Sequence, residues 1–165
     1  MSVEGIFLEE SGKTLRQLTS RIEACLGRLT DDQIWARGRE NENAIGNLAL
    51  HLAGNVRQWI IASLGGAPDL RKRDEEFAAR GGRTTQELLA QLKATVEEAD
   101  AVISTLDTAR LTREYTIQKY RVSGLAAVYH VVEHFAQHTG QIIFATKMLT
   151  GEDLGFYSHL KTAAR

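Results

Sequence analysis

Apolar residues recur at three- and four-residue steps along four stretches of this sequence, a spacing typical of amphipathic helices. The pattern predicts helices over residues 3–29, 44–64, 85–107 and 123–149. Helix breakers fall between these stretches. The second stretch ends at Gly65-Gly66-Ala67-Pro68, which contains the only proline of the chain. Thr84 or Thr85 can cap the third, and Glu87 follows Thr84 at the spacing of a capping box. The pattern therefore predicts an all-α protein, an up-down four-helix bundle with a crossover connection.

Two connections between these helices are long. Residues 65–83 are polar and rich in glycine, and the charged run 71–76 within them is expected to be a solvated loop. Residues 108–122 contain Tyr115, Ile117 and Tyr120 at alternating positions, which predicts short strands forming a small hairpin. Long connections are uncommon in plain bundles and often carry function. We therefore expect both segments to shape the entrance to a site.

Length and charge restrict the possible classes of protein. A chain of 165 residues suits one domain, here 1–165, with one core. The formal net charge of −1 offers no electrostatic footprint for nucleic acid. No apolar run reaches the roughly 18 residues of a membrane span. The one cysteine, Cys25, excludes a disulfide within the chain and is expected to be buried, which fits a reducing, cytoplasmic compartment.

Four of the five histidines lie in the second and fourth predicted helices. His134 and His138 are four residues apart, so their side chains lie on one helix face, one turn apart. His51, in the middle of the second helix, is the best-placed third imidazole. Three histidines with open positions left over describe a catalytic type of metal site, with zinc or nickel favoured. The alternative is ordinary: a histidine among leucines, such as His51, is often a hydrogen-bonded core residue.

Two further polar residues of the fourth helix lie near this pair. His130 precedes His134 by one turn, but three histidines spaced this way extend about 12 Å along the helix. One ion cannot easily reach both ends, so we expect His130 to line a cleft or to support a ligand. Glu133 points about 100° away from His134. The zinc-protease motif requires a glutamate directly after the first histidine, and Glu133 precedes it instead. It is a candidate for orienting His51 or packing against another helix.

Amide side chains flank the candidate ligands. Asn47 and Asn55 lie one turn before and after His51, and Gln141 lies about one turn after His138. Ligating histidines usually donate their second ring N–H to a carbonyl, carboxylate or amide. These three residues are therefore candidates for supporting the ligands or lining the cleft. Polar residues at helix ends or on the surface are the equally ordinary alternative.

Two motifs carry a family resemblance. The segment His51–Asn55, HLAGN, and the segment 130–157, HVVEHFAQHTGQIIFATKMLTGEDLGFY, resemble the DinB-like superfamily of metal-binding four-helix bundles. More narrowly, they resemble a branch named only as a domain of unknown function. The resemblance implies that His51, His134 and His138 hold the metal. Many members have Arg or Val before the Gly-Gln pair, where this chain has Thr139.

The resemblance implies three alternative functions. One is a metal-dependent transferase that uses a low-molecular-weight thiol, and another is a metal-dependent hydrolase. The third is a non-catalytic, stress-related metal-binding module. A hydrolase should show a carboxylate base in the cleft, and none is evident in the sequence. Tyr120, Arg121 and Tyr157 are candidate substrate contacts, and we expect a homodimer, the commonest closed assembly.

Overall fold

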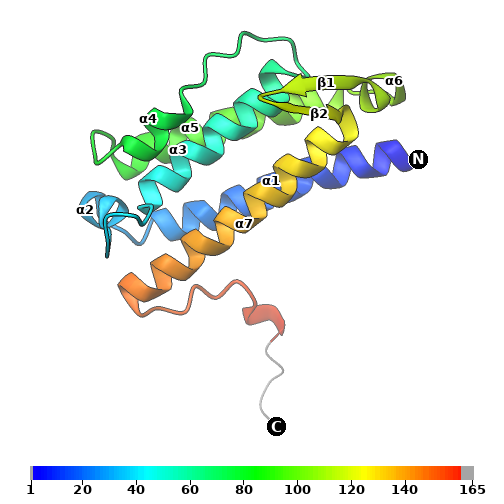
Figure 1. Cartoon of the computed structure of the whole chain (residues 1–165). Helices are drawn as coiled ribbons and strands as arrows, with labels where there is room; N and C mark the ends of the chain where they lie inside the picture. The colour runs from blue at the N-terminus through cyan, green and yellow to red at the C-terminus, as the bar shows by residue number, and fades with distance from the viewer. Residues whose placement is uncertain (1, 161–165) are drawn as a thin grey trace.

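Four long helices dominate the computed structural model, which describes residues 2–160 except for the side chain of His159 (Figure 1). Their bounds are α1 Val3–Leu26, α3 Ile45–Val56, α5 Thr85–Ser104 and α7 Gly124–Thr150. A π-helical turn, η1 (Arg57–Ala62), continues α3 without a break. The predicted four-helix architecture is therefore confirmed. The shorter elements are α2 Asp31–Trp35, α4 Arg73–Ala78, α6 Thr108–Thr112, β1 Glu114–Ile117, β2 Tyr120–Ser123 and η2 Ser158–Leu160.

Side chains and a glycine define the helix ends. At the start of α5, the Glu87 amide donates to Thr84 Oγ1 at 3.2 Å, and the Thr84 amide donates to Glu87 Oε2 at 2.8 Å. This is the capping box expected from the sequence. At the start of α7, Ser123 Oγ accepts the Ala126 amide at 3.2 Å. Gly151 ends α7 with φ of 71°, a left-handed conformation that glycine adopts at little cost.

The four long helices pack as a ring. Helix α1 contacts α5 and α7, and α3 contacts the same two helices. Each contributes fully buried apolar side chains to one core, among them Leu15, Leu52, Leu92 and Phe135. Burying such side chains stabilises the fold by roughly 1.5–3 kcal/mol each before entropy is counted. The core therefore holds α3 against α7, the two helices that carry the candidate ligands.

The connection from η1 to α5 is the crossover expected from the sequence. Trp35 Nε1, in α2, donates to the Arg83 carbonyl at 2.8 Å, so α5 begins at the end of the bundle where α3 also begins. Helices α3 and α5 therefore run in the same direction, and residues 63–84 return along the bundle (Figure 1). Helix α4 lies in this return segment and packs against α3.

The segment before α7 forms the predicted hairpin. Strands β1 and β2 pair antiparallel, with Ile117 opposite Tyr120. Ile117 is buried, which fixes the hairpin to the bundle. Gln118, at the turn, has φ of 57°, a strained value for a residue other than glycine. Among residues 2–160, no helix is both long and apolar enough to cross a membrane.

Candidate metal centre

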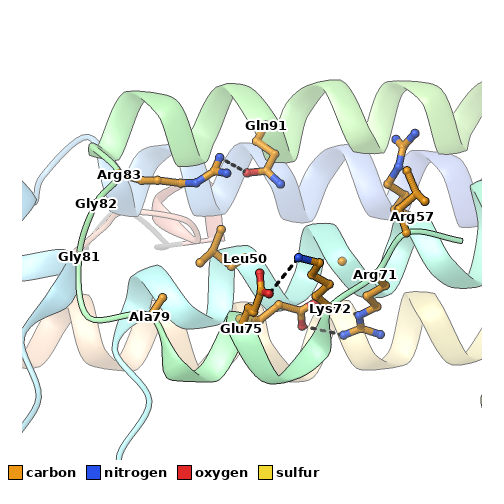
Figure 2. A pocket seen from close by; sticks show the side chains of 13 residues that line it. Leu50, Arg57, Arg71, Lys72, Glu75, Ala79, Gly81, Gly82, Arg83 and Gln91 are labelled. Atoms are coloured by element: carbon orange, nitrogen blue, oxygen red, sulfur yellow. Dashed lines mark hydrogen bonds and ion pairs between the residues drawn. The ribbon is translucent and has the colours of Figure 1, made fainter.

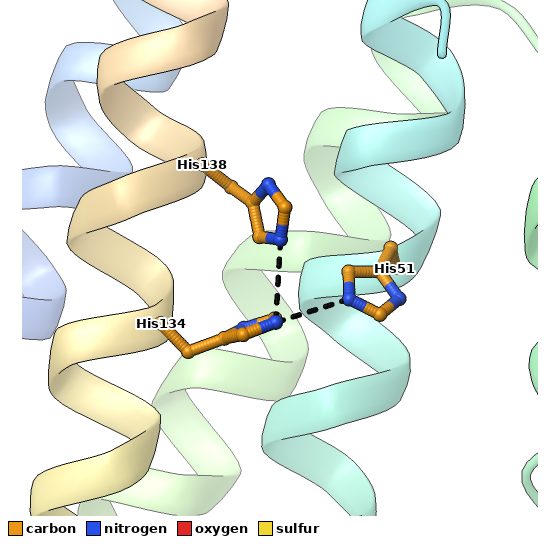
Figure 3. A group of neighbouring side chains, drawn as sticks. All are labelled: His51, His134 and His138. Atoms are coloured by element: carbon orange, nitrogen blue, oxygen red, sulfur yellow. Dashed lines mark hydrogen bonds between the residues drawn. The ribbon is translucent and has the colours of Figure 1, made fainter. Parts of the chain in front are cut away.

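Three histidines from α3 and α7 converge on one point (Figure 3). His134 Nε2 lies 3.1 Å from His51 Nε2 and 3.2 Å from His138 Nε2. The ligand atoms of all three lie within 4.8 Å of one another. A tetrahedral ion with nitrogen ligands at 2.0–2.1 Å separates neighbouring ligand atoms by about 3.3 Å. The donor set and its spacing therefore fit one divalent transition ion.

Hydrogen bonds orient two of the rings. His138 Nδ1 lies 2.7 Å from Gln141 Oε1, and His51 Nδ1 lies 2.9 Å from Glu76 Oε2. The Gln141 oxygen accepts from an N–H, so the hydrogen of the neutral His138 ring is on Nδ1 and its Nε2 lone pair is free to bind a metal. His51 Nδ1 lies between the Glu76 acceptor and a donor, Arg71 Nη2 at 3.1 Å, and donation to the charged carboxylate places its hydrogen on Nδ1 as well. Gln141 thus supports His138, as its spacing suggested.

The environment favours the neutral form of the α7 imidazoles. Burial, the largest cause, together with the neighbouring His138 and His51 lowers the pKa of His134 to about 3. Burial also lowers the pKa of His138, against an opposing contribution from Gln141. Metal binding requires an unprotonated imidazole nitrogen. These two ligands are therefore ready to bind a metal ion at neutral pH.

Two side chains of the crossover, Glu76 and Arg71, contact His51 at Nδ1, the ring nitrogen opposite the proposed metal-binding Nε2. Their side chains are only 11% and 4% exposed. Arg71 donates to Glu76 Oε1 through Nε and to Oε2 through Nη2, both at 2.8 Å. Burial alone would raise the pKa of the Glu76 carboxyl, but hydrogen bonds and charge from Arg71 and His51 outweigh it and lower that pKa. The carboxylate is therefore ionised and orients His51.

The expectation of a solvated loop over residues 71–76 is wrong in two respects: residues 73–76 belong to helix α4, and the side chains of Arg71 and Glu76 are largely buried. Within this run Lys72 and Glu75 are exposed and pair with each other, as expected, whereas Arg71 and Glu76 turn inward. Alternating charge in the sequence does not distinguish the two pairs. The only signal in the sequence was the unusual length of the connection.

Helix α3 is shaped to receive this pair. A Cβ atom on Gly54 would lie 2.0 Å from Glu76 Oε1 and 3.0 Å from Arg71 Nε, so only glycine leaves room for the pair. Nearer the start of α3, Asn47 Nδ2 donates to the carbonyls of Glu76, at 2.8 Å, and Ala79, at 3.0 Å. Asn47 therefore supports His51 indirectly, by docking α4 on α3.

The network continues from Arg71 to the hairpin. Gln58 Oε1, on η1, accepts from Arg71 Nη1 at 3.0 Å and from Gln118 Nε2 at 2.8 Å. Gln58 Nε2 donates to Asp69 Oδ2 at 2.8 Å. π-Helical turns are rare and often occur at functional sites. Here the turn presents Gln58 and the next residue, Trp59, to the side of the bundle where the histidines lie.

A cavity of about 430 Å³ opens beside the three-histidine cluster and is lined by two of its members, His51 and His134. We call it the histidine cavity, and its lining includes His51, His134, Asn55, Trp59, His130, Arg73, Gln118 and Tyr120. The His130 ring lies 4.0 Å from the Trp59 ring and 5.4 Å from the His134 ring, measured between centroids. His130 therefore lines the cavity next to the three-histidine cluster, as expected, and is not part of it.

The remaining candidates lie elsewhere. Glu133 is exposed and its carboxylate accepts from Gln137 at 2.9 Å, so Glu76, not Glu133, orients His51. The charge of Glu133 acts on the site only by raising the pKa of His130, against the larger lowering by burial.

The three loop candidates separate as well. Tyr120 lines the histidine cavity. Arg121 lies 2.5 Å from exposed Glu114, and Tyr157 lies under the Arg21 guanidinium at 5.3 Å, in a different cavity. Of these three candidates, only Tyr120 therefore lies where a ligand of the histidines could contact it.

A second cavity, of about 450 Å³, shares Arg71 with the first, and Figure 2 shows the residues that line it. We call it the paired cavity, and its lining includes Leu50, Gly54, Arg57, Arg71, Lys72, Glu75, Glu76, Arg83 and Gln91. Its basic side chains have partners: Arg57 pairs with Glu98 and Lys72 with Glu75, and Arg83 donates to Gln91 at 2.7 Å. Carboxylates therefore compensate the charges of Arg57 and Lys72, and the Arg83 guanidinium already has a hydrogen-bond acceptor.

Comparisons with known proteins agree with this architecture. The model of a family described as protein of unknown function, DUF1572, matches residues 2–161. No curated protein matches the chain. A conserved protein from Enterococcus faecalis has a similar structure, with a TM-score of 0.76, 17% identity, and coverage of 92% of this chain and 99% of that one. A DinB-like protein, YjoA, from Bacillus subtilis is similar as well, with a TM-score of 0.68 and 17% sequence identity. The match covers 90% of this chain and 97% of that one. This chain therefore belongs to the DUF1572 family and has the DinB-like fold.

Proposed function

We propose that this protein binds one divalent transition ion, zinc or nickel, through His51, His134 and His138, and acts as a metal-dependent enzyme on a low-molecular-weight thiol. The observation that carries the proposal is the convergence of three Nε2 atoms next to the histidine cavity, which two of the three residues, His51 and His134, line. Three protein ligands leave a tetrahedral ion at least one position for a small molecule. The same cavity gives that molecule access.

The lining of the cavity favours a thiol transferase over a hydrolase. Metal-dependent hydrolysis commonly needs a carboxylate that accepts a proton from the attacking water. No Asp or Glu lines the described part of the histidine cavity, and Glu76 is fully engaged by Arg71 and His51. A divalent ion bound here would lower the pKa of a thiol and supply a thiolate without a general base.

The protein residues around the ion have separate tasks. Glu76 and Gln141 fix the orientation of His51 and His138. Phe135, fully buried one residue after His134, anchors α7 against the core. The rings of His130 and Trp59 pack against each other, tilted by 37°, and form one wall of the cavity. We infer that this wall positions the substrate and excludes water from it.

Metal analysis of purified protein tests the proposal. Wild-type protein should retain about one ion per chain after dialysis against a mild chelator. His134→Ala should lose most of it, because its Nε2 lies between the other two. The matched control His130→Ala should retain it. Equal metal in wild type and His134→Ala would refute the ligand assignment, and metal-loaded protein with no thiol-dependent turnover would refute the transferase.

We further propose that residues 1–165 fold as one domain that forms a homodimer in the cytoplasm. Helix α7 supports the dimer, because large apolar side chains are exposed along it at Leu125, Tyr129, Phe144 and Met148. Light scattering at micromolar concentration tests this assembly. A mass near that of one chain, 18.3 kDa, would refute it.

A further inference from the structure

Charge in and around the histidine cavity is not balanced by the protein. Three neutral imidazoles leave the full charge of a divalent ion uncompensated by its ligands. Glu76, the nearest carboxylate, is neutralised by Arg71. Arg73, also in the lining, forms no ion pair with any described residue. A molecule that fills this cavity therefore meets excess positive charge at two points.

The position of Arg73 links its charge to the histidines. Its guanidinium lies 4.8 Å from the centre of the Phe77 ring, and that ring lies 4.6 Å from the ring of His51. The cation is held over an aromatic face, which leaves its N–H groups free to donate. Since one ring separates Arg73 from His51, a chain of a few carbon atoms can reach from the histidines to the guanidinium.

Three buried polar atoms of residues that line this cavity have no hydrogen-bond partner among the described residues, and one of them is Nδ1 of the proposed ligand His134. The other two lie outside the metal centre. Asn55 Oδ1 and Trp59 Nε1 are buried without a hydrogen bond to any described residue, and both side chains are only 4% exposed. A buried polar group left unsatisfied costs about 1–3 kcal/mol. Both line the histidine cavity, where a bound molecule would satisfy them. The paired cavity has no such groups among the described residues.

We propose that the histidine cavity selects small molecules that carry a carboxylate, which Arg73 binds at the rim while Asn55 and Trp59 hydrogen-bond to polar groups deeper in the cavity. This inference rests on the proposed function for the metal-binding atom of the ligand, a thiol sulfur. The new element is the negative charge that the ligand carries away from its thiol. The cavity volume lies within the range of about 300–1,000 Å³ that holds small organic ligands.

Calorimetric titration of the zinc-loaded protein tests the selection. The probes are 3-mercaptopropionate and 6-mercaptohexanoate, each compared with its own methyl ester, which keeps the thiol and removes the charge. At least one acid should bind about fivefold or more tightly than its ester, the strength of an exposed ion pair. Arg73→Gln should abolish this preference and leave the affinity for the ester within about twofold. Arg73→Lys should retain part of it.

The outcomes separate the two proposals. Arg39→Gln, at an exposed arginine outside the cavity, controls for net charge and should leave the preference unchanged. Bound zinc with no preference for either acid overturns the inference, as does a preference that survives Arg73→Gln. Failure to retain zinc, or failure to bind all four probes, refutes the proposed function instead.

Asn55→Leu gives an independent test of the deeper contacts. Replacing a buried asparagine normally destabilises a protein, because its partners lose their hydrogen bonds. If Asn55 serves a ligand, the variant should be as stable as wild type or more so, retain zinc, and bind the better acid about threefold or more weakly. A variant that is destabilised while its affinity for the acid is unchanged would show a structural role and overturn this part of the inference.

Discussion

Two cavities of nearly equal volume flank Arg71, about 430 Å³ beside the histidines and about 450 Å³ on the other side. The histidine cavity contains the unpaired Arg73 and the unsatisfied polar atoms of Asn55 and Trp59. In the paired cavity Arg57 pairs with Glu98, and Figure 2 shows Lys72 with Glu75 and Arg83 with Gln91. Volume therefore does not distinguish the two; unsatisfied polar groups do, because they cost free energy until a ligand arrives.

The wall between the cavities, Glu76 with Arg71, offers the largest test of this difference. Glu76→Ala removes the acceptor of the His51 ring and leaves Arg71 buried without its partner. Loss of such a supporting group typically lowers metal affinity about 10–100-fold. Competition with a chromophoric chelator measures the affinity. Glu75→Gln, in the next position but exposed, is the matched control and should bind metal as wild type does. Equal affinity in Glu76→Ala and Glu75→Gln would show that the wall does not support the histidines.

Gly54→Ala should displace the same pair, Glu76 and Arg71, without changing either residue. The added Cβ would lie 2.0 Å from Glu76 Oε1, so the carboxylate must shift away from His51. We expect metal affinity to fall about tenfold, at the lower end of the range for supporting groups. The control is Gly140→Ala in α7, where a Cβ meets nothing within 4 Å. It should bind metal normally and gain up to about 1 kcal/mol of stability from helix propensity. Unchanged affinity in Gly54→Ala would mean that Glu76 is free to adjust.

Lowering the pH should reduce the stability contributions of His134 and of Glu76 in different pH windows. In metal-free protein the folded state holds His134 neutral down to about pH 3, whereas the unfolded chain takes up a proton near pH 6.5. The unfolded state binds more protons between these values, so stability is complete above pH 6.5 and falls as the pH is lowered. We expect a loss of about 1 kcal/mol between pH 7.5 and 5.5, measured by urea unfolding.

The pKa of Glu76 is lowered on folding, so its contribution is present above its unfolded value of about 4.5 and lost only below it. His134→Leu should remove part of the loss of stability above pH 5, because the lowered pKa of His138 contributes to that loss as well. It should leave the loss below pH 4.5, which is due to Glu76, unchanged. A variant that keeps the full loss between pH 7.5 and 5.5 would assign that loss to other groups.

The smallest effect is expected in the paired cavity. Lys72→Gln removes an exposed charge that Glu75 already compensates, a pair whose side chains are 72% and 71% exposed. Exposed pairs of this kind contribute little, so metal affinity and thiol binding should stay within about twofold of wild type. A larger change in the calorimetric titration would show that ligands use the paired cavity as well, and the contrast between the two would no longer hold.

The sequence by itself determined the four helices, the capping box at Thr84 and the placement of the histidines on two of those helices. These features are local. The spacing of apolar residues and of His134 and His138 is set by backbone hydrogen bonds within one helix, so it can be recognised without knowing the partner. The hairpin was predictable for the same reason, from alternation along a short segment.

Only the tertiary structure decided what surrounds the histidines. Glu76 lies 25 residues beyond His51 and meets it because the crossover returns along α3, with Gly54 leaving room. The same return places Arg73 over Phe77 at the mouth of the cavity. Within one charged run, Arg71 and Glu76 turn inward while Lys72 and Glu75 stay in solvent. Which charge is buried depends on the path of the loop, because only an existing partner offsets the cost of removing it from water.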